Sequence, residues 1–302
     1  MTRIRNFAAA ATLAALPFEA HSQESVYYPT PQDALEALME ALDTGTSEAV
    51  LAALGPEASG LIRDDKAPDR ADDWALVVAV YRQGYRFVPV EDGRVTVELG
   101  TDGWPFPIEL AEGDDGWAFD IESGKQEIVA RLIGLNELDV IDILHAYVDI
   151  QREFRQVDHD GDGVLEFASS LISSAEDRDG LYWPGGDSPV GAAAARASLD
   201  GFSENGADLP AEPFFGYYFR LLTAQGPDAP GGAMDYFVNG HLVGGHALLA
   251  VPAVFGETGT FSFLVGENGL LFEADLGKET LETALEITTY NPDARWRPMP
   301  KE

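Results

Sequence analysis

The residues best spaced for chemistry form a short acidic loop, residues 158–166. Its first six residues, Asp-His-Asp-Gly-Asp-Gly, fit the pattern D-x-D-x-D-G. Calcium takes six to eight oxygen ligands in proteins, and alternate carboxylates on one tight loop converge on a single point. The spacing therefore predicts a Ca²⁺ site with ligands at alternate positions: Asp158, Asp160, Asp162, the carbonyl of Val164, and Glu166.

This acidic loop departs from an EF-hand at its twelfth position, where Ser169 replaces the usual bidentate glutamate. The candidates to supply the missing carboxylate are Glu176, Asp177 and Asp179. Without it, we expect a dissociation constant of about 10⁻⁴–10⁻³ M. Leu165 is expected to anchor the loop in the core. The alternative is a solvated Asp/Gly turn at the end of a helix.

Outside the acidic loop, no pattern in the sequence predicts a catalytic residue or a cofactor-binding residue. There is no cysteine, and the motifs G-x-S-x-G and H-E-x-x-H are absent. His241 and His246 are five residues apart, which favours turn and core roles over metal binding. The sequence therefore favours a non-catalytic protein. The alternative is a polysaccharide or peptidoglycan hydrolase that uses paired carboxylates as acid and base.

The element that must carry the loop is a long helix, expected from residue 125 to about residue 156 with a break at residues 134–136. Apolar residues recur along its second part at spacings of three and four, on a face wide enough to predict burial against a sheet. Strands are expected at residues 215–222, 236–238, 246–251, 260–265 and 270–273, and a closing helix at 281–287. This order of one long helix and an antiparallel sheet is similar to the globular part of pilins and pseudopilins.

The part before the long helix predicts a separate α+β domain. Helices are expected at residues 32–42, 47–54 and 74–85, and then an antiparallel meander at 95–99, 106–110 and 117–121. This pattern resembles the nuclear-transport-factor-like fold. The expected organisation is a signal peptide (1–22), an N-terminal domain (23–124) and a helix-plus-sheet domain (125–302).

The first residues predict export. Arg3 and Arg5 precede an apolar, uncharged stretch, and Ala20 and Ser22 suit a cleavage site before Gln23. We therefore expect a periplasmic or secreted protein that does not insert into a membrane after cleavage. The net charge of −33 repels phosphate backbones, so nucleic acid is not an expected partner.

Several stretches together are similar to an uncharacterised family of exported bacterial proteins, catalogued as domain of unknown function 2950. The stretches are residues 103–107, 131–138, 158–167, 179–184, 216–227, 229–232 and 296–298. The resemblance implies export and brings no activity. The leading hypothesis is an exported, calcium-stabilised binding or assembly module whose partner is an envelope protein or polymer. Besides the hydrolase, a chaperone-like or stress protein is a further alternative.

Overall fold

The computed structural model describes residues 25–62, 70–173, 178–204 and 207–300. The chain forms two compact units, Met1–Lys125 and Gln126–Glu302. Helices and antiparallel sheets occur in both, so the expected α+β class is confirmed. No helix in the described ranges is long and apolar enough to cross a membrane.

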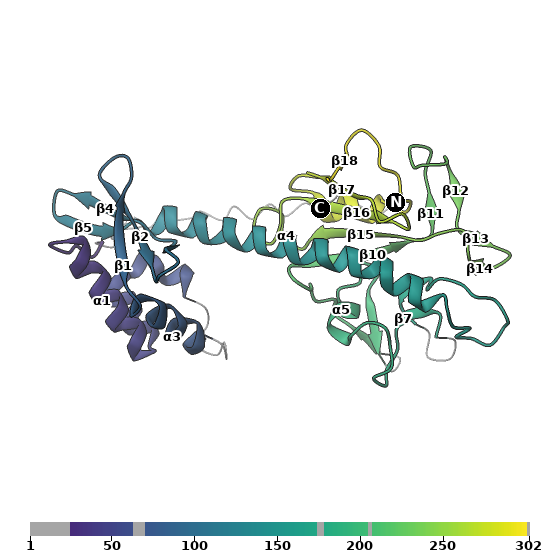
Figure 1. Cartoon of the computed structure of the whole chain (residues 1–302), viewed down its shortest axis with the longest axis horizontal. Helices are drawn as coiled ribbons and strands as arrows, with labels where there is room; N and C mark the ends of the chain where they lie inside the picture. The colour runs from purple at the N-terminus through teal and green to yellow at the C-terminus, as the bar shows by residue number, and fades with distance from the viewer. Residues whose placement is uncertain (1–24, 63–69, 174–177, 205–206, 301–302) are drawn as a thin grey trace, which may run out of the picture. The chain divides into compact units, whose positions relative to one another are not determined.

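The first unit opens with helices (Figure 1). They are α1 (Pro31–Thr44), α2 (Ser47–Leu54), the 3₁₀ helix η1 (Pro56–Leu61) and α3 (Arg70–Tyr81). The Thr30 side chain caps α1 by accepting a hydrogen bond from the Asp33 amide. Gly45 ends α1 with a left-handed φ of 71°, a conformation that costs glycine little.

An antiparallel sheet completes the first unit, in the order β1-β2-β4-β5 with β3 paired to β2. Its strands are β1 (Tyr85–Pro89), β2 (Arg94–Leu99), β3 (Trp104–Pro105), β4 (Leu110–Gly113) and β5 (Gly116–Phe119). The sequence misses β1, and it places the middle strand of the meander too early. Phe106 and Ile108 are buried, so their alternation marks burial and not a strand.

The long helix α4 (Ile121–Phe154) is continuous, so the predicted break at residues 134–136 is wrong. A single glycine inside a helix costs only about 1 kcal/mol relative to alanine. Two neighbouring side chains fix this stretch within the second unit. The Asn136 amide donates to the Thr258 carbonyl at 2.8 Å, and a Glu137 carboxylate oxygen accepts from the Thr260 amide at 2.8 Å.

The second unit is built around an antiparallel sheet, in the order β10-β15-β16-β17-β18. These strands are β10 (Tyr217–Leu222), β15 (Ala247–Pro252), β16 (Ser262–Gly266), β17 (Leu271–Ala274) and β18 (Arg297–Pro298). Shorter elements surround the sheet. They are β6 (Ser170–Ile172), β7 (Gly180–Tyr182), α5 (Ala192–Arg196), β8 (Phe202–Glu204), β9 (Ala207–Leu209), β11 (Ala224–Gln225), β12 (Met234–Asp235), β13 (Phe237–Val238), β14 (His241–Leu242) and α6 (Thr280–Glu286).

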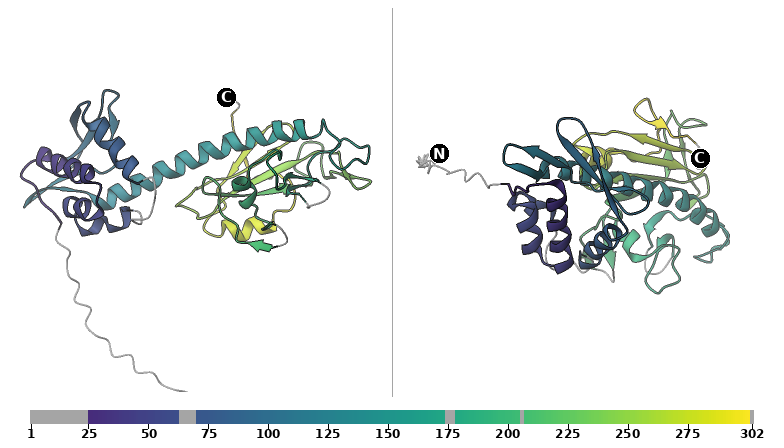
Figure 2. Two further views of the ribbon diagram at one scale, coloured as in Figure 1. Left: turned by 90° about the horizontal axis from the view of Figure 1, so that it is seen from below. Right: turned by 60° about the vertical axis from the view of Figure 1, so that its left-hand side comes forward.

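Both faces of this sheet are covered, as Figure 2 shows for α4 and α6 on its two sides. Alternate residues of a strand point to opposite faces. Leu248 and Ala250 of β15 therefore join the core cluster that contains Leu144 of α4, whereas Leu249 joins the cluster with Ala284 of α6. Two-sided burial explains why β15 is buried along its whole length.

The burial expected for the second part of the long helix is confirmed. From Val140 to Phe154, one face of α4 packs into the core of the second unit. Earlier in the helix, Leu135 and Leu138 are each 62% exposed.

Candidate metal centre

The acidic loop, residues 158–166, leaves the C-terminal end of α4 and re-enters the core at Phe167. Leu165 does not anchor the loop, contrary to expectation, because it is 49% exposed. Phe167 takes this role. Its side chain is buried, and its amide donates to the Leu242 carbonyl at 2.9 Å.

The end of the loop is also fixed to α4 by the buried side chain of Gln151. The Ala168 amide donates to Gln151 Oε1 at 2.9 Å, and Gln151 Nε2 donates to the Ala168 carbonyl at 3.1 Å. Gln151 Nε2 also lies 3.2 Å from the hydroxyl of buried Tyr147. The helix therefore holds both the start and the end of the loop.

Asp158 organises the turn inside the loop. Its two carboxylate oxygens accept hydrogen bonds from the amides of Gly161, at 2.8 Å, and Gly163, at 3.0 Å. Both glycines have left-handed φ angles, 78° and 91°, which larger residues rarely adopt. Burial alone would raise the pKa of Asp158. The hydrogen bonds from Gly163 and Gly161 outweigh it and lower that pKa, which favours the ionised form of the carboxyl group.

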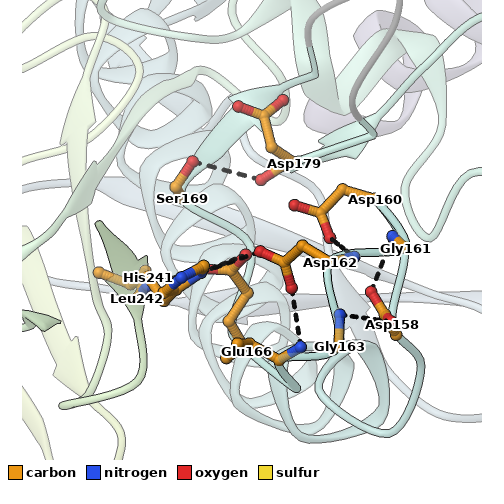
Figure 3. A network of polar contacts seen from close by, with 11 residues as sticks. Asp158, Asp160, Gly161, Asp162, Gly163, Glu166, Ser169, Asp179, His241 and Leu242 are labelled. Carbon is orange, nitrogen blue, oxygen red and sulfur yellow. Dashed lines mark hydrogen bonds and ion pairs between the residues drawn. The ribbon is translucent and has the colours of Figure 1, made fainter. Parts of the chain in front are cut away.

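Three aspartates of the loop converge, as Figure 3 shows. Asp158, Asp160 and Asp162 each offer one carboxylate oxygen, and the three atoms lie within 4.8 Å of one another. Calcium–oxygen bonds of about 2.4 Å place two oxygens on opposite sides of the ion about 4.8 Å apart. The spacing of the three oxygens is therefore compatible with a single Ca²⁺ ion.

A second group shares Asp162 and includes a residue that the sequence did not assign. One ligand atom each of Asp162, Glu166 and His241 lies within 4.8 Å of the other two. His241 Nδ1 is 3.2 Å from Asp162 Oδ2 and 3.7 Å from Glu166 Oε1. Glu166 Oε2 accepts from the Leu242 amide at 2.8 Å, which brings strand β14 to the loop. For His246, in contrast, the expected core position is confirmed, since it is only 1% exposed.

A pocket of about 370 Å³ opens beside these groups. Asp160, Asp162, Val164, Glu166 and His241 all contribute to its lining, together with apolar residues such as Phe154 and Phe237. Four of the five ligands expected from the sequence therefore line one cavity. The fifth, Asp158, supports the loop from within through its hydrogen bonds to backbone amides.

Of the three candidates to replace the twelfth-position glutamate, the structure describes Asp179 only, and Asp179 belongs to neither group. Asp179 lines the pocket, and its carbonyl accepts from the Ser169 amide at 2.8 Å. Its carboxylate instead accepts from the Ser173 hydroxyl at 3.2 Å, and Figure 3 places it apart from the loop carboxylates. The other two candidates, Glu176 and Asp177, lie outside the described residues.

The two groups differ in the metals they suit. An all-oxygen set favours Ca²⁺ or Mg²⁺, whereas a set with an imidazole nitrogen suits Zn²⁺ or another transition metal. Because Asp162 belongs to both groups, one ion at a time is the simplest occupancy.

Comparison with known proteins establishes the family of the chain. A family model described as "Protein of unknown function (DUF2950)" matches residues 25–299. No curated protein matches the chain, and no solved structure does. The pilin-like and nuclear-transport-factor-like interpretations therefore stay predictions. Since the match covers nearly the whole sequence, the chain belongs to the DUF2950 family of proteins of unknown function.

Proposed function

We propose that this protein is an exported, non-catalytic module of the cell envelope, whose second unit binds calcium at the acidic loop and uses the adjoining surface for binding or assembly. The observation that carries the proposal is the convergence of the Asp158, Asp160 and Asp162 carboxylates. In the D-x-D-x-D-G loop their charges meet at one point, as calcium ligation requires.

Electrostatics favours a cation at this point. Two like charges 4 Å apart repel by about 1 kcal/mol in water and about 4 kcal/mol near a protein surface. The three loop carboxylates approach to within 4.8 Å, and a divalent cation would replace their repulsion with attraction. Since Glu166 contacts both His241 and Leu242, the ion would also stabilise the position of β14 beside the loop.

The melting temperature of the second unit should rise in Ca²⁺ and fall back on chelation. At 10 to 100 times the dissociation constant, bound calcium stabilises a protein by about 1.4–2.7 kcal/mol, or several degrees. Differential scanning calorimetry in Ca²⁺, Mg²⁺, Zn²⁺ and chelator measures this effect. We expect the largest rise in Ca²⁺; a rise in Zn²⁺ alone would assign the site to the group that contains His241.

Two matched variants test where the ion binds. Asp160→Ala should abolish the rise, because it removes a carboxylate from the all-oxygen group. Asp275→Ala should keep it. Asp160 accepts a hydrogen bond from the Asp162 amide at 3.2 Å, and Asp275 likewise accepts one from the Gly277 amide at 2.9 Å. Asp275 belongs to neither group of candidate ligands. Loss of the calcium-induced rise in melting temperature in both variants would count against ion binding at the acidic loop.

Export is the second part of the proposal, and it is supported by the N-terminal pattern of Arg3, Arg5 and the apolar stretch that follows. N-terminal sequencing of protein from the periplasm or medium should begin near Gln23. A chain that still begins at Met1 there would contradict cleavage.

The hydrolase alternative receives less support from the geometry. A general acid needs a carboxyl group with a raised pKa, and the pKa of Asp158 is lowered. This lowered pKa favours a cation site over an acid–base pair at the acidic loop.

A further inference from the structure

Arginine side chains line a second pocket in the same unit. It is an open cavity of about 270 Å³, lined by Arg152, Arg155, His246 and Glu267, among others. Phe167 lines both this pocket and the one beside the acidic loop. We call the second cavity the arginine pocket. Its volume lies just below the roughly 300–1,000 Å³ of typical small-molecule sites, so it suits a small ligand.

Arg155 supplies a positive charge that forms no ion pair with the described residues of the unit. The chain carries 52 acidic and 19 basic residues, so ion pairs are easily formed. Across the part of the chain that the structure describes, Arg155 nevertheless has no carboxylate partner, and its guanidinium lies over the Phe167 ring at 4.7 Å from the centroid. Such stacking fixes the guanidinium plane and leaves its N–H donors free for a ligand.

His246 is a buried polar group that also lacks a partner. It is 1% exposed, and within the described residues its Nδ1 has no hydrogen bond. Its ring packs edge-on against Tyr147 and Phe167, at centroid distances of 5.2 and 4.7 Å. Buried polar atoms without partners are rare in native proteins and call for an explanation. His246 also lines the arginine pocket, so a ligand bound there would alter the surroundings of its imidazole.

The charged side chains that line the pocket determine which kind of ligand it can bind. Arg152 is already paired with Asp149 at 2.5 Å, so Arg155 is the free cation. Glu267 can only accept hydrogen bonds when ionised, so a ligand that contacts it must also bear an O–H or N–H group. From the stacked Arg155 and the His246 imidazole that lines the cavity, we infer that the arginine pocket binds a small hydroxylated ligand through its carboxylate or phosphate group.

Isothermal titration calorimetry on the purified protein tests this inference. The two probes are lactate, with a carboxylate and a hydroxyl, and inorganic phosphate, and chelator is present so that the acidic loop does not contribute. We expect at least one probe to bind. Arg155→Gln should weaken that binding about tenfold or more, as expected for hydrogen bonds to charged groups. The matched control Arg82→Gln removes the same charge from an exposed arginine of the first unit and should leave binding unchanged.

Binding of neither probe would overturn the inference, and so would equal weakening by both variants, which would indicate unspecific attraction. Unchanged melting temperatures show that the variants are folded. NMR of the His246 imidazole provides a second measurement, because its signals should move on addition of the bound probe and not in Arg155→Gln. Binding that leaves these signals unmoved would place the ligand elsewhere and overturn the assignment.

Discussion

Lowering the pH from 6.5 to 4 should reduce the free energy of unfolding of the second unit by roughly 3 kcal/mol through His246 alone. Burial, and then the nearby charge of Arg152, lower the pKa of His246 from 6.5 to about 4. The unfolded chain therefore binds a proton in this range that the folded chain excludes. The stabilisation is complete above pH 6.5, declines as the pH falls, and is lost below about pH 4.

Chemical denaturation between pH 7 and pH 4 measures this effect. Carboxylates of the chain also titrate near pH 4. The quantity to compare between variants is therefore the slope of the unfolding free energy against pH. His246→Gln cannot be protonated in this range and should show a flatter dependence of unfolding free energy on pH. His145→Gln, which removes an exposed histidine of α4, should keep the steep dependence. Equal slopes in His246→Gln and the parent protein would show that His246 is not held neutral by the fold.

Gln151→Ala should cost about 3–5 kcal/mol of unfolding free energy in the second unit. The substitution leaves a cavity beside Tyr147, and it removes the partners of both the amide and the carbonyl of Ala168. Each of these buried backbone groups costs about 1–3 kcal/mol when it is unsatisfied. Because Ala168 closes the acidic loop against α4, calcium affinity should fall as well.

The control for this prediction is five residues further along the chain. Gln156 also donates to a backbone carbonyl, that of Arg152 at 3.1 Å, but its side chain is exposed. Gln156→Ala should therefore change the unfolding free energy by no more than about 0.5 kcal/mol. A loss below about 1 kcal/mol for Gln151→Ala would contradict the structural role given to this side chain.

Much of the fold can be predicted from local patterns in the sequence. The errors arise where a local pattern misleads or where tertiary contacts override it. The fully apolar strand β15 is predicted correctly because burial on both faces leaves no polar alternation to confuse it. The pattern fails at β1, where aromatic and apolar residues directly after α3 extend the helical signal to Tyr85. It also fails at Gly134, since tertiary contacts of Asn136 and Glu137 fix the helix there.

Only part of the candidate site could be predicted from the sequence. The aspartates are found because their spacing within six residues is itself the signal. His241 is missed because its approach to the loop depends on a tertiary contact. The amide of its neighbour Leu242 donates to the carboxylate of Glu166, 76 positions away in the sequence. Leu165 and Phe167 could not be distinguished as anchors, because only the pairing of Phe167 with Leu242 shows where the loop ends.

The most direct test of the central claim is a calcium titration followed by NMR of the backbone amides. Calcium should shift the amides of Gly161, Gly163 and Leu242, because these donate to carboxylates of the acidic loop. The shifts should saturate together, with a dissociation constant of about 10⁻⁴–10⁻³ M. Unshifted loop amides at saturating calcium, or small shifts spread evenly over the acidic surface, would contradict a calcium site at residues 158–166.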